Sequence, residues 1–129
     1  MVYGLGCDLV EIARIKRALE RQPKFSDNVL SEQERVVYDA RRALSEARGI
    51  RYLASRWAAK EAFSKSVGTG FRGPVNFDDV SVLNNELGAP FLRFTGELLE
   101  FIQSRGLKFQ ISLSDTESAA MAVVICEKE

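Results

Sequence analysis

Asp8, Glu61 and Lys65 are the charged residues that stand out as candidates for a catalytic role. Asp8 follows a short β-prone segment, and the end of a strand presents a side chain from a rigid element. Glu61 and Lys65 lie four residues apart in an apolar, alanine-rich stretch, so they share one face of the helix expected there. Carboxylates and a lysine are the side chains used in acid–base and metal-assisted reactions.

Each of these features also has a simpler explanation. An Asp that precedes a helix is usually a helix cap. Glu61 and Lys65 could form an i,i+4 ion pair worth about 0.3–0.5 kcal/mol. The segment Gly68-Thr69-Gly70 could bring backbone N–H groups to a phosphate, but it follows a helix and is more simply a helix stop and turn.

The sequence has no histidine and only two cysteines, Cys7 and Cys126. A Ser-His-Asp or Cys-His catalytic site as usually built is therefore excluded, and a structural zinc site is not expected. Metal chemistry must use oxygen ligands, which indicates a hard ion such as Mg2+. Two cysteines are too few for a disulfide framework, so a reduced, cytoplasmic setting is the simpler interpretation.

The 18 basic and 18 acidic residues cancel, so charge can guide recognition only through a local patch. The first predicted helix carries Arg14, Arg17 and Arg21 opposite its apolar stripe, and Lys24 follows just past it. Such residues usually form a solvated face, but their concentration in a neutral protein favours docking of an acidic partner. We expect no nucleic-acid binding and no membrane segment, because no aromatic stripe accompanies the arginines and no apolar run approaches roughly 20 residues.

The hydrophobic pattern predicts one α+β domain over residues 1–129, with helices packed on an antiparallel sheet that is completed late in the chain. Ser31-Glu32-Gln33-Glu34 matches a capping box. The predicted elements are a strand at 2–5, helices from 12 to about 23, from about 31, and from 51 to 67, strands at 79–83 and 90–94, a helix at 96–105, and strands at 107–113 and 119–126.

Three segments have the character of motifs. Residues 4–11 read G-L-G-C-D-L-V-E, residues 56–70 read R-W-A-A-K-E-A-F-S-K-S-V-G-T-G, and residues 85–90 read N-E-L-G-A-P. Together they resemble the G-x-G-x-D opening, the R-[FW]-A-[AV]-K-E-A-x-x-K segment with its G-T-G, and the G-x-P turn of holo-acyl-carrier-protein synthases. The likeness spans essentially the whole chain in register.

The resemblance implies an enzyme that moves the phosphopantetheine arm of coenzyme A onto a serine of an acyl carrier protein for fatty acid synthesis. It implies that Asp8 and Glu61 hold Mg2+ and that Lys65 lies near the pyrophosphate, which makes these three the catalytic residues. Acyl carrier proteins are acidic and helical, so the basic helix would be the docking surface. The cofactor-binding positions are Arg56, Lys65, Gly68, Thr69, Gly70, Pro90, Ser114 and Thr116.

One position departs from the family pattern. Asp115 occupies or adjoins the place where many members have a histidine, and a carboxylate cannot favour the 3′-phosphate of coenzyme A. Short members of the family assemble as trimers with cofactor sites at the subunit boundary, so we expect a homotrimer with the apolar strand 119–126 as a contact surface. The alternative is a non-catalytic carrier-binding module that keeps the basic helix.

Overall fold

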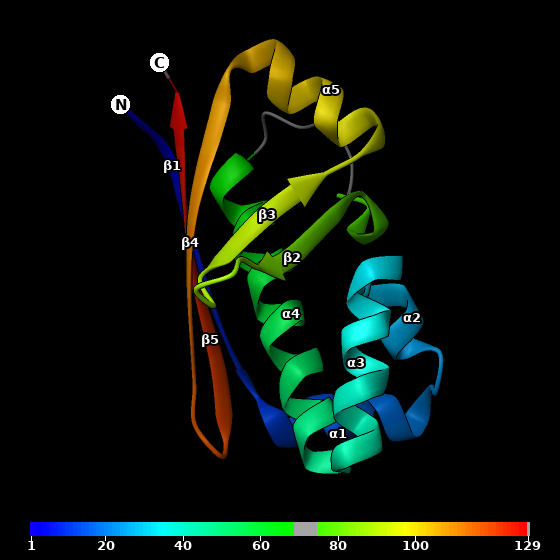
Figure 1. Ribbon diagram of the computed structural model, residues 1–129. Coiled ribbons are helices and arrows are strands. Elements are labelled where there is room, and N and C mark those ends of the chain that lie inside the picture. Colours follow the sequence, from blue (N-terminus) through cyan, green and yellow to red (C-terminus); the bar gives the residue numbers. More distant parts are fainter. Residues whose placement is uncertain (69–74, 129) are drawn as a thin grey trace.

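The computed structural model describes residues 1–68 and 75–128 (Figure 1). Thr69 and Gly70 of the predicted glycine turn lie outside the described residues. The α+β fold predicted from the sequence is confirmed. The elements in chain order are β1 (Val2–Glu11), α1 (Ile12–Arg21), α2 (Phe25–Val29), α3 (Glu32–Leu44), α4 (Glu46–Val67), the 3-10 turn η2 (Phe77–Asp79), β2 (Val80–Asn84), β3 (Pro90–Phe94), α5 (Gly96–Arg105), β4 (Leu107–Asp115) and β5 (Ala119–Lys128).

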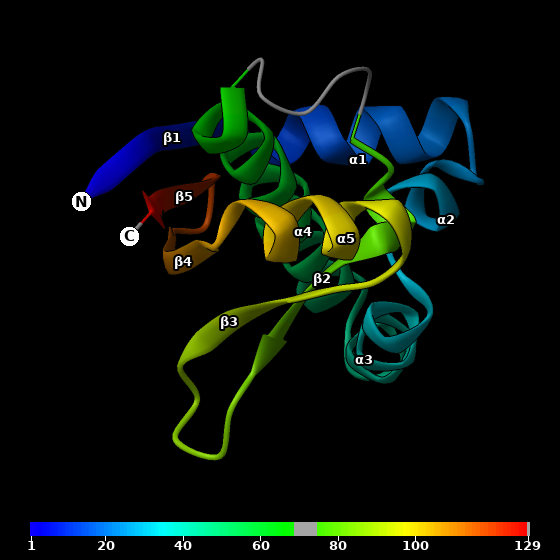
Figure 2. The ribbon, with the colours of Figure 1, turned by 90° about the horizontal axis from the view of Figure 1, so that it is seen from above.

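The strands form two antiparallel ladders. One is a three-stranded sheet in the order β1-β5-β4, and the other is the β2–β3 hairpin. Figure 1 shows the sheet along one side of the molecule with α4 beside it, and Figure 2 shows the β2–β3 hairpin extending beyond the rest of the fold. Helix α4 contacts β1, β5 and α3, so it lies between the sheet and the other early helices.

Helix α4 is the central element of the core. Alanines and other buried residues lie on most of its faces, as expected for a helix surrounded by protein. It begins at Glu46, earlier than predicted, because the Ser45 hydroxyl caps it by accepting a hydrogen bond from the N–H of Arg48 at 3.4 Å. It ends at Val67, and the following Gly68 stops it as predicted, with a positive φ of 65° and a ψ of −144°.

A fully buried ion pair joins α4 to its neighbours. The Nζ of Lys60 lies 2.5 Å from an Oε of Glu34 and also donates to the carbonyls of Val29 at 2.7 Å and Phe77 at 3.0 Å. The other carboxylate oxygen of Glu34 accepts from the N–H of Val82 at 2.7 Å. Because removing one partner of a buried pair costs about 3–5 kcal/mol, this network resists any shift of α4 relative to α2, α3 and β2.

The N-terminal region differs from the prediction in two places. Strand β1 extends to Glu11, so Asp8 lies within the strand opposite Ala122 rather than after it, and it does not cap α1. The short helix α2 was not predicted from the sequence. The capping box is confirmed, since the N–H of Ser31 donates to Glu34 at 2.8 Å and the N–H of Glu34 donates to the Ser31 hydroxyl at 3.4 Å.

Within the part of the chain described above, none of the helices combines the length and the hydrophobicity needed to cross a membrane.

Candidate active site

Asp8 and Lys65 meet where β1 lies against α4. Alternate residues of β1 face the helix, and Asp8 is on that inner face with 18% of its side chain exposed. The Nζ of Lys65 lies 3.3 Å from an Oδ of Asp8 and donates to the carbonyl of Cys7 at 3.0 Å. The contact joins residues that are 57 positions apart in the sequence.

The simpler interpretation of Glu61 and Lys65 as an i,i+4 ion pair is wrong. Among the described residues, the ion pairs within 4 Å are Lys60 with Glu34 and Lys65 with Asp8. Lys65 is 55% exposed, so its contact with Asp8 is screened by solvent and contributes little to stability.

Glu61 shares the electrostatic environment of this pair. Burial raises the pKa of Glu61 above its usual value, and the negative charge of Asp8 raises it further. The positive charges of Lys65 and Arg14 act in the opposite direction and lower the pKa of Glu61. Asp8, Lys65 and Arg14 therefore all lie within electrostatic range of Glu61.

This donor set fits Mg2+. In residues 1–68 and 75–128, no group of three or more His, Cys, Asp or Glu side chains is placed to hold a metal ion. Mg2+ requires no such group, because it keeps several waters and binds through one or two carboxylates and substrate phosphates. The repulsion between Asp8 and Glu61 is also what a divalent cation would relieve.

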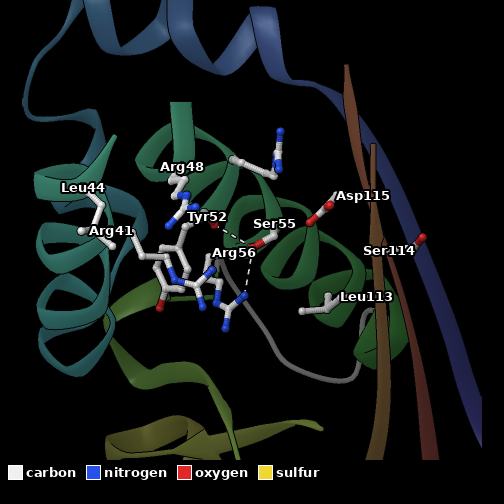
Figure 3. Close-up of a pocket in the computed structure, with 10 residues that line it drawn as sticks. Arg41, Leu44, Arg48, Tyr52, Ser55, Arg56, Leu113, Ser114 and Asp115 are labelled. Atoms are coloured by element: carbon white, nitrogen blue, oxygen red, sulfur yellow. Dashed lines mark hydrogen bonds between the residues drawn. The ribbon is translucent and has the colours of Figure 1, made fainter. Parts of the chain in front are cut away.

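A separate pocket of about 640 Å³ opens on the other side of α4 (Figure 3). Four of its lining residues are arginines from α3 and α4: Arg41, Arg48, Arg51 and Arg56. Ser114 and Asp115, at the end of β4, line it from the sheet. Among the described lining residues Asp115 is the only acid, so the net charge of the pocket favours an anion.

Arg56 is held rigidly at this pocket. Its Nη2 donates to the amide oxygen of Asn84 at 2.7 Å, its Nη1 to the hydroxyl of Ser55 at 2.9 Å, and its Nε to the carbonyl of Val82 at 3.3 Å. Its guanidinium carbon lies 4.2 Å from the centroid of the Tyr52 ring. Burial lowers the pKa of Arg56 from its usual value.

Arg41 and Tyr52 complete this part of the pocket. The guanidinium carbon of Arg41 lies 5.1 Å from the centroid of the Tyr52 ring, so two cations contact one aromatic ring. The Tyr52 hydroxyl is buried and has no hydrogen-bond partner in the described structure.

The other predicted cofactor positions are dispersed. Pro90 begins β3 opposite Asn84, which accepts a hydrogen bond from Arg56 of the pocket, but Pro90 itself does not line the pocket. The hydroxyl of Thr116 shapes the β4–β5 turn, because it accepts from the N–H groups of Ser118 at 3.2 Å and Ala119 at 3.1 Å. Of the glycine turn, Gly68 alone is described.

The carboxylate cluster and the arginine pocket lie on different sides of α4. None of Asp8, Glu61 and Lys65 lines the pocket. Tyr52 and Glu61 are nine residues apart, which corresponds to a rotation of about 180° around a helix with 3.6 residues per turn. One copy of the chain therefore does not bring all the predicted site residues together.

The basic face on α1 is exposed as predicted. Arg14, Arg17, Arg21 and Lys24 are all exposed, while Ile15 points into the core. Arg14 also acts on the pKa of Glu61, so the basic face begins at the carboxylate cluster.

Sequence reasoning missed most of the arginine pocket. Arg48, Tyr52 and Arg56 recur at four-residue spacing on one face of α4, a signal that could have been noticed. Arg41 comes from a different helix, and nothing in the spacing shows that this face would turn toward the end of β4.

The chain has close relatives over its full length. The sequence model of the 4′-phosphopantetheinyl transferase superfamily matches residues 4–124. A holo-[acyl-carrier-protein] synthase of Herminiimonas arsenicoxydans is 44% identical over 130 aligned residues, covering 100% of each chain. Another from Cupriavidus metallidurans is 41% identical, covering 99% of this chain and 90% of that protein.

Solved structures show the same fold. Holo-[acyl-carrier-protein] synthase from Neisseria meningitidis matches with a TM-score of 0.88 at 34% identity, covering 99% of this chain and 100% of that one. The synthase from Bacillus anthracis in complex with CoA (3′,5′-ADP) matches with a TM-score of 0.79 at 34% identity, covering 100% of this chain and 99% of that one.

The mutual influence of the three charged residues can be tested by titrating Glu61. Asp8→Asn removes a charge that raises the pKa of Glu61, so that pKa should fall. Lys65→Met removes a charge that lowers it, so the pKa should rise. Carbon-13 NMR of the Glu61 carboxyl carbon, in metal-free protein, measures both. Shifts of the same sign in the two variants would contradict the arrangement.

Proposed function

Since this chain belongs to the 4′-phosphopantetheinyl transferase superfamily, we propose that it transfers 4′-phosphopantetheine from coenzyme A to a serine of an apo acyl carrier protein, and so supports fatty acid synthesis. The observation that carries the proposal is the contact of Asp8 from β1 with Lys65 from α4, within electrostatic range of Glu61. The complex of the Bacillus anthracis relative supports it, because 3′,5′-ADP is the leaving product of this reaction. We propose the cytoplasm as its compartment, since Cys7 and Cys126 are both free thiols.

Asp8 and Glu61 are the residues that would hold Mg2+. When bound there, the ion would offset the charge of the coenzyme A pyrophosphate during transfer. The two carboxylates come from rigid elements, and the buried Lys60–Glu34 pair fixes the helix that carries Glu61. The protein therefore keeps the two ligands in place before the substrate binds.

The transfer is an in-line displacement at the β-phosphorus of coenzyme A. The serine oxygen of the carrier forms a bond to that phosphorus, and the bond from the phosphorus to the bridging oxygen breaks. Adenosine 3′,5′-bisphosphate leaves with the bridging oxygen, and Lys65 stabilises the charge that develops on it. Glu61 is our candidate for accepting the serine proton, directly or through a water.

We propose that the active enzyme is a homotrimer with shared sites. The cluster of Asp8, Glu61 and Lys65 and the arginine pocket with Arg56 lie on different sides of α4, so a second copy must supply one half if coenzyme A contacts both. We also propose six further residues as contacts of coenzyme A: Gly68, Thr69, Gly70, Pro90, Ser114 and Thr116.

The outer face of the three-stranded sheet is a suitable interface. In the described structure, no helix covers the face that points away from α4 (Figure 1). Apolar side chains stand exposed on it, including Leu5 at 63%, Leu9 at 69% and Met121 at 43%. Leu9 and Met121 are paired in register, so the patch is continuous across β1 and β5.

The basic face of α1 is our proposed docking surface for the carrier. Arg14, Arg17, Arg21 and Lys24 are exposed, and acidic helical proteins complement such a surface. Because the charge of Arg14 acts on Glu61, a carrier bound to this face would lie near the carboxylate cluster. The exposed basic face alone would also suit the alternative, a non-catalytic carrier-binding module.

Intact-mass spectrometry of apo carrier distinguishes the two functions. With coenzyme A and Mg2+, the carrier should gain one phosphopantetheine group, and chelation should abolish the gain. Asp8→Ala and Glu61→Ala should each reduce turnover by several orders of magnitude at saturating coenzyme A, because each removes a metal ligand. The exposed acid Asp39 on α3 provides the control, and Asp39→Ala should keep full activity. Carrier binding without a mass change would favour the alternative, and full activity of either ligand variant would refute the metal assignment.

Charge reversal on α1 tests the docking surface. Arg17→Glu should raise the KM for carrier and leave the KM for coenzyme A nearly unchanged, because Arg17 lies on the exposed face. The effect should shrink at high salt, since exposed charges are screened over about 8 Å at physiological ionic strength. Arg105→Glu, the same change on α5, is the control and should alter neither constant. Equal increases in both KM values for Arg17→Glu would show that Arg17 is not part of the docking surface for the carrier.

Light scattering tests the assembly. The wild-type chain of 14.4 kDa should have the mass of three copies, and Met121→Glu should dissociate it and abolish transfer together, because the sites are shared. Val36→Glu, at an exposed apolar position on α3, should remain trimeric and active. A monomeric wild type with full activity would contradict the shared site.

A further inference from the structure

Two glycines of β1 touch the backbone of α4 directly. A Cβ atom added at Gly6 would lie 1.9 Å from the carbonyl oxygen of Ala62, and one added at Gly4 would lie 1.9 Å from the carbonyl oxygen of Ser66. Real Cβ contacts essentially never fall below 3.0 Å. The strand and the helix therefore approach to a distance that only the hydrogen atoms of glycine permit.

These contacts lie beside the catalytic candidates. Ala62 directly follows Glu61, and Ser66 directly follows Lys65. Gly6 and Asp8 are two residues apart and so face α4 from the same side of the strand. The two glycine contacts are thus backbone-to-backbone contacts next to the cluster formed by Asp8, Glu61 and Lys65.

The obstacles at both glycines cannot move aside. Each is a main-chain carbonyl within α4, rather than the end of a flexible side chain. An alanine would require a separation of at least 3.0 Å in place of 1.9 Å, so strand and helix would have to part by about 1 Å. The buried Lys60–Glu34 pair holds α4 from the opposite side and resists that shift.

We propose that Gly4 and Gly6 are positioning residues of the active site, with separate effects. Gly6, through Ala62, sets the separation of the Asp8 and Glu61 carboxylates. Gly4, through Ser66, sets the reach of Lys65 to Asp8 and to the carbonyl of Cys7. This inference rests on the proposed function, because it assigns these distances a role in metal binding and transfer.

The size of the expected effect on rate and metal affinity follows from this shift of about 1 Å. A misplacement of about 1 Å can cost on the order of 10²-fold in rate, and loss of support around a metal ligand typically costs about 10–100-fold in metal affinity. A uniform loss of stability would produce neither change, because the molecules that remain folded would keep the wild-type kcat and Mg2+ affinity.

Gly4→Ala and Gly6→Ala form a matched pair, because in both the new Cβ atom would lie 1.9 Å from a carbonyl oxygen of α4. Gly6→Ala should weaken Mg2+ binding, measured by calorimetry, by at least about tenfold. Gly4→Ala should leave Mg2+ affinity within about threefold of wild type and lower kcat by roughly 10²-fold, because it displaces Lys65 and not the carboxylates. Gly4→Ala also keeps the test available if Gly6→Ala does not fold, since Gly4 lies near the start of the strand and is half-buried.

Ile102→Ala on α5 is the control for stability. Ile102 is buried in the core and lies outside the contact of β1 with α4, so its truncation should lower the melting temperature without changing Mg2+ affinity or kcat. If the glycine variants behave like Ile102→Ala while the wild type binds Mg2+ and modifies the carrier, the positioning role is overturned and the proposed function stands. A wild type that does neither overturns both.

Discussion

Helix α4 packs so closely against β1 that a Cβ atom at Gly4 or Gly6 would lie 1.9 Å from a helix carbonyl oxygen. The proposed chemistry depends on this close packing of α4 against β1. It places Asp8, from a strand near the amino terminus, against Lys65 and within electrostatic range of Glu61. The same helix is fixed on its other side by the buried Lys60–Glu34 pair and its backbone acceptors. A rigid support on two sides suits a site that works by positioning and charge rather than through a covalent bond between enzyme and substrate.

The position of α4 also accounts for the two half-sites that we propose for one chain. A helix in the middle of a small domain presents functional residues in two directions: Asp8 and Lys65 lie at one side of it, and Arg56 with its pocket lies at the other. The apolar outer face of the sheet, next to the same strand that carries Asp8, gives copies of the chain a means of association. Assembly and chemistry are then linked through β1.

Local rules predicted part of the fold from the sequence, and motif likeness singled out three residues that the structure brings within electrostatic range of one another: Asp8, Glu61 and Lys65. The local rules located the capping box at Ser31 and the first residues of most strands. The extension of β1 past Asp8 depends on pairing with β5, which lies more than a hundred residues later in the chain. The pairing of Lys65 with Asp8 and the arginine pocket likewise arise from packing between distant segments, and residue spacing does not encode such contacts.

The central claim is that Asp8 and Glu61 jointly hold one divalent ion. Crystals of the protein soaked with Mn2+ in place of Mg2+, with coenzyme A present, test it through the anomalous signal of the metal. The account predicts one peak for each cluster, in contact with carboxylate oxygens of both Asp8 and Glu61. A peak that contacts only one of them, or that lies in the arginine pocket or elsewhere, would contradict it.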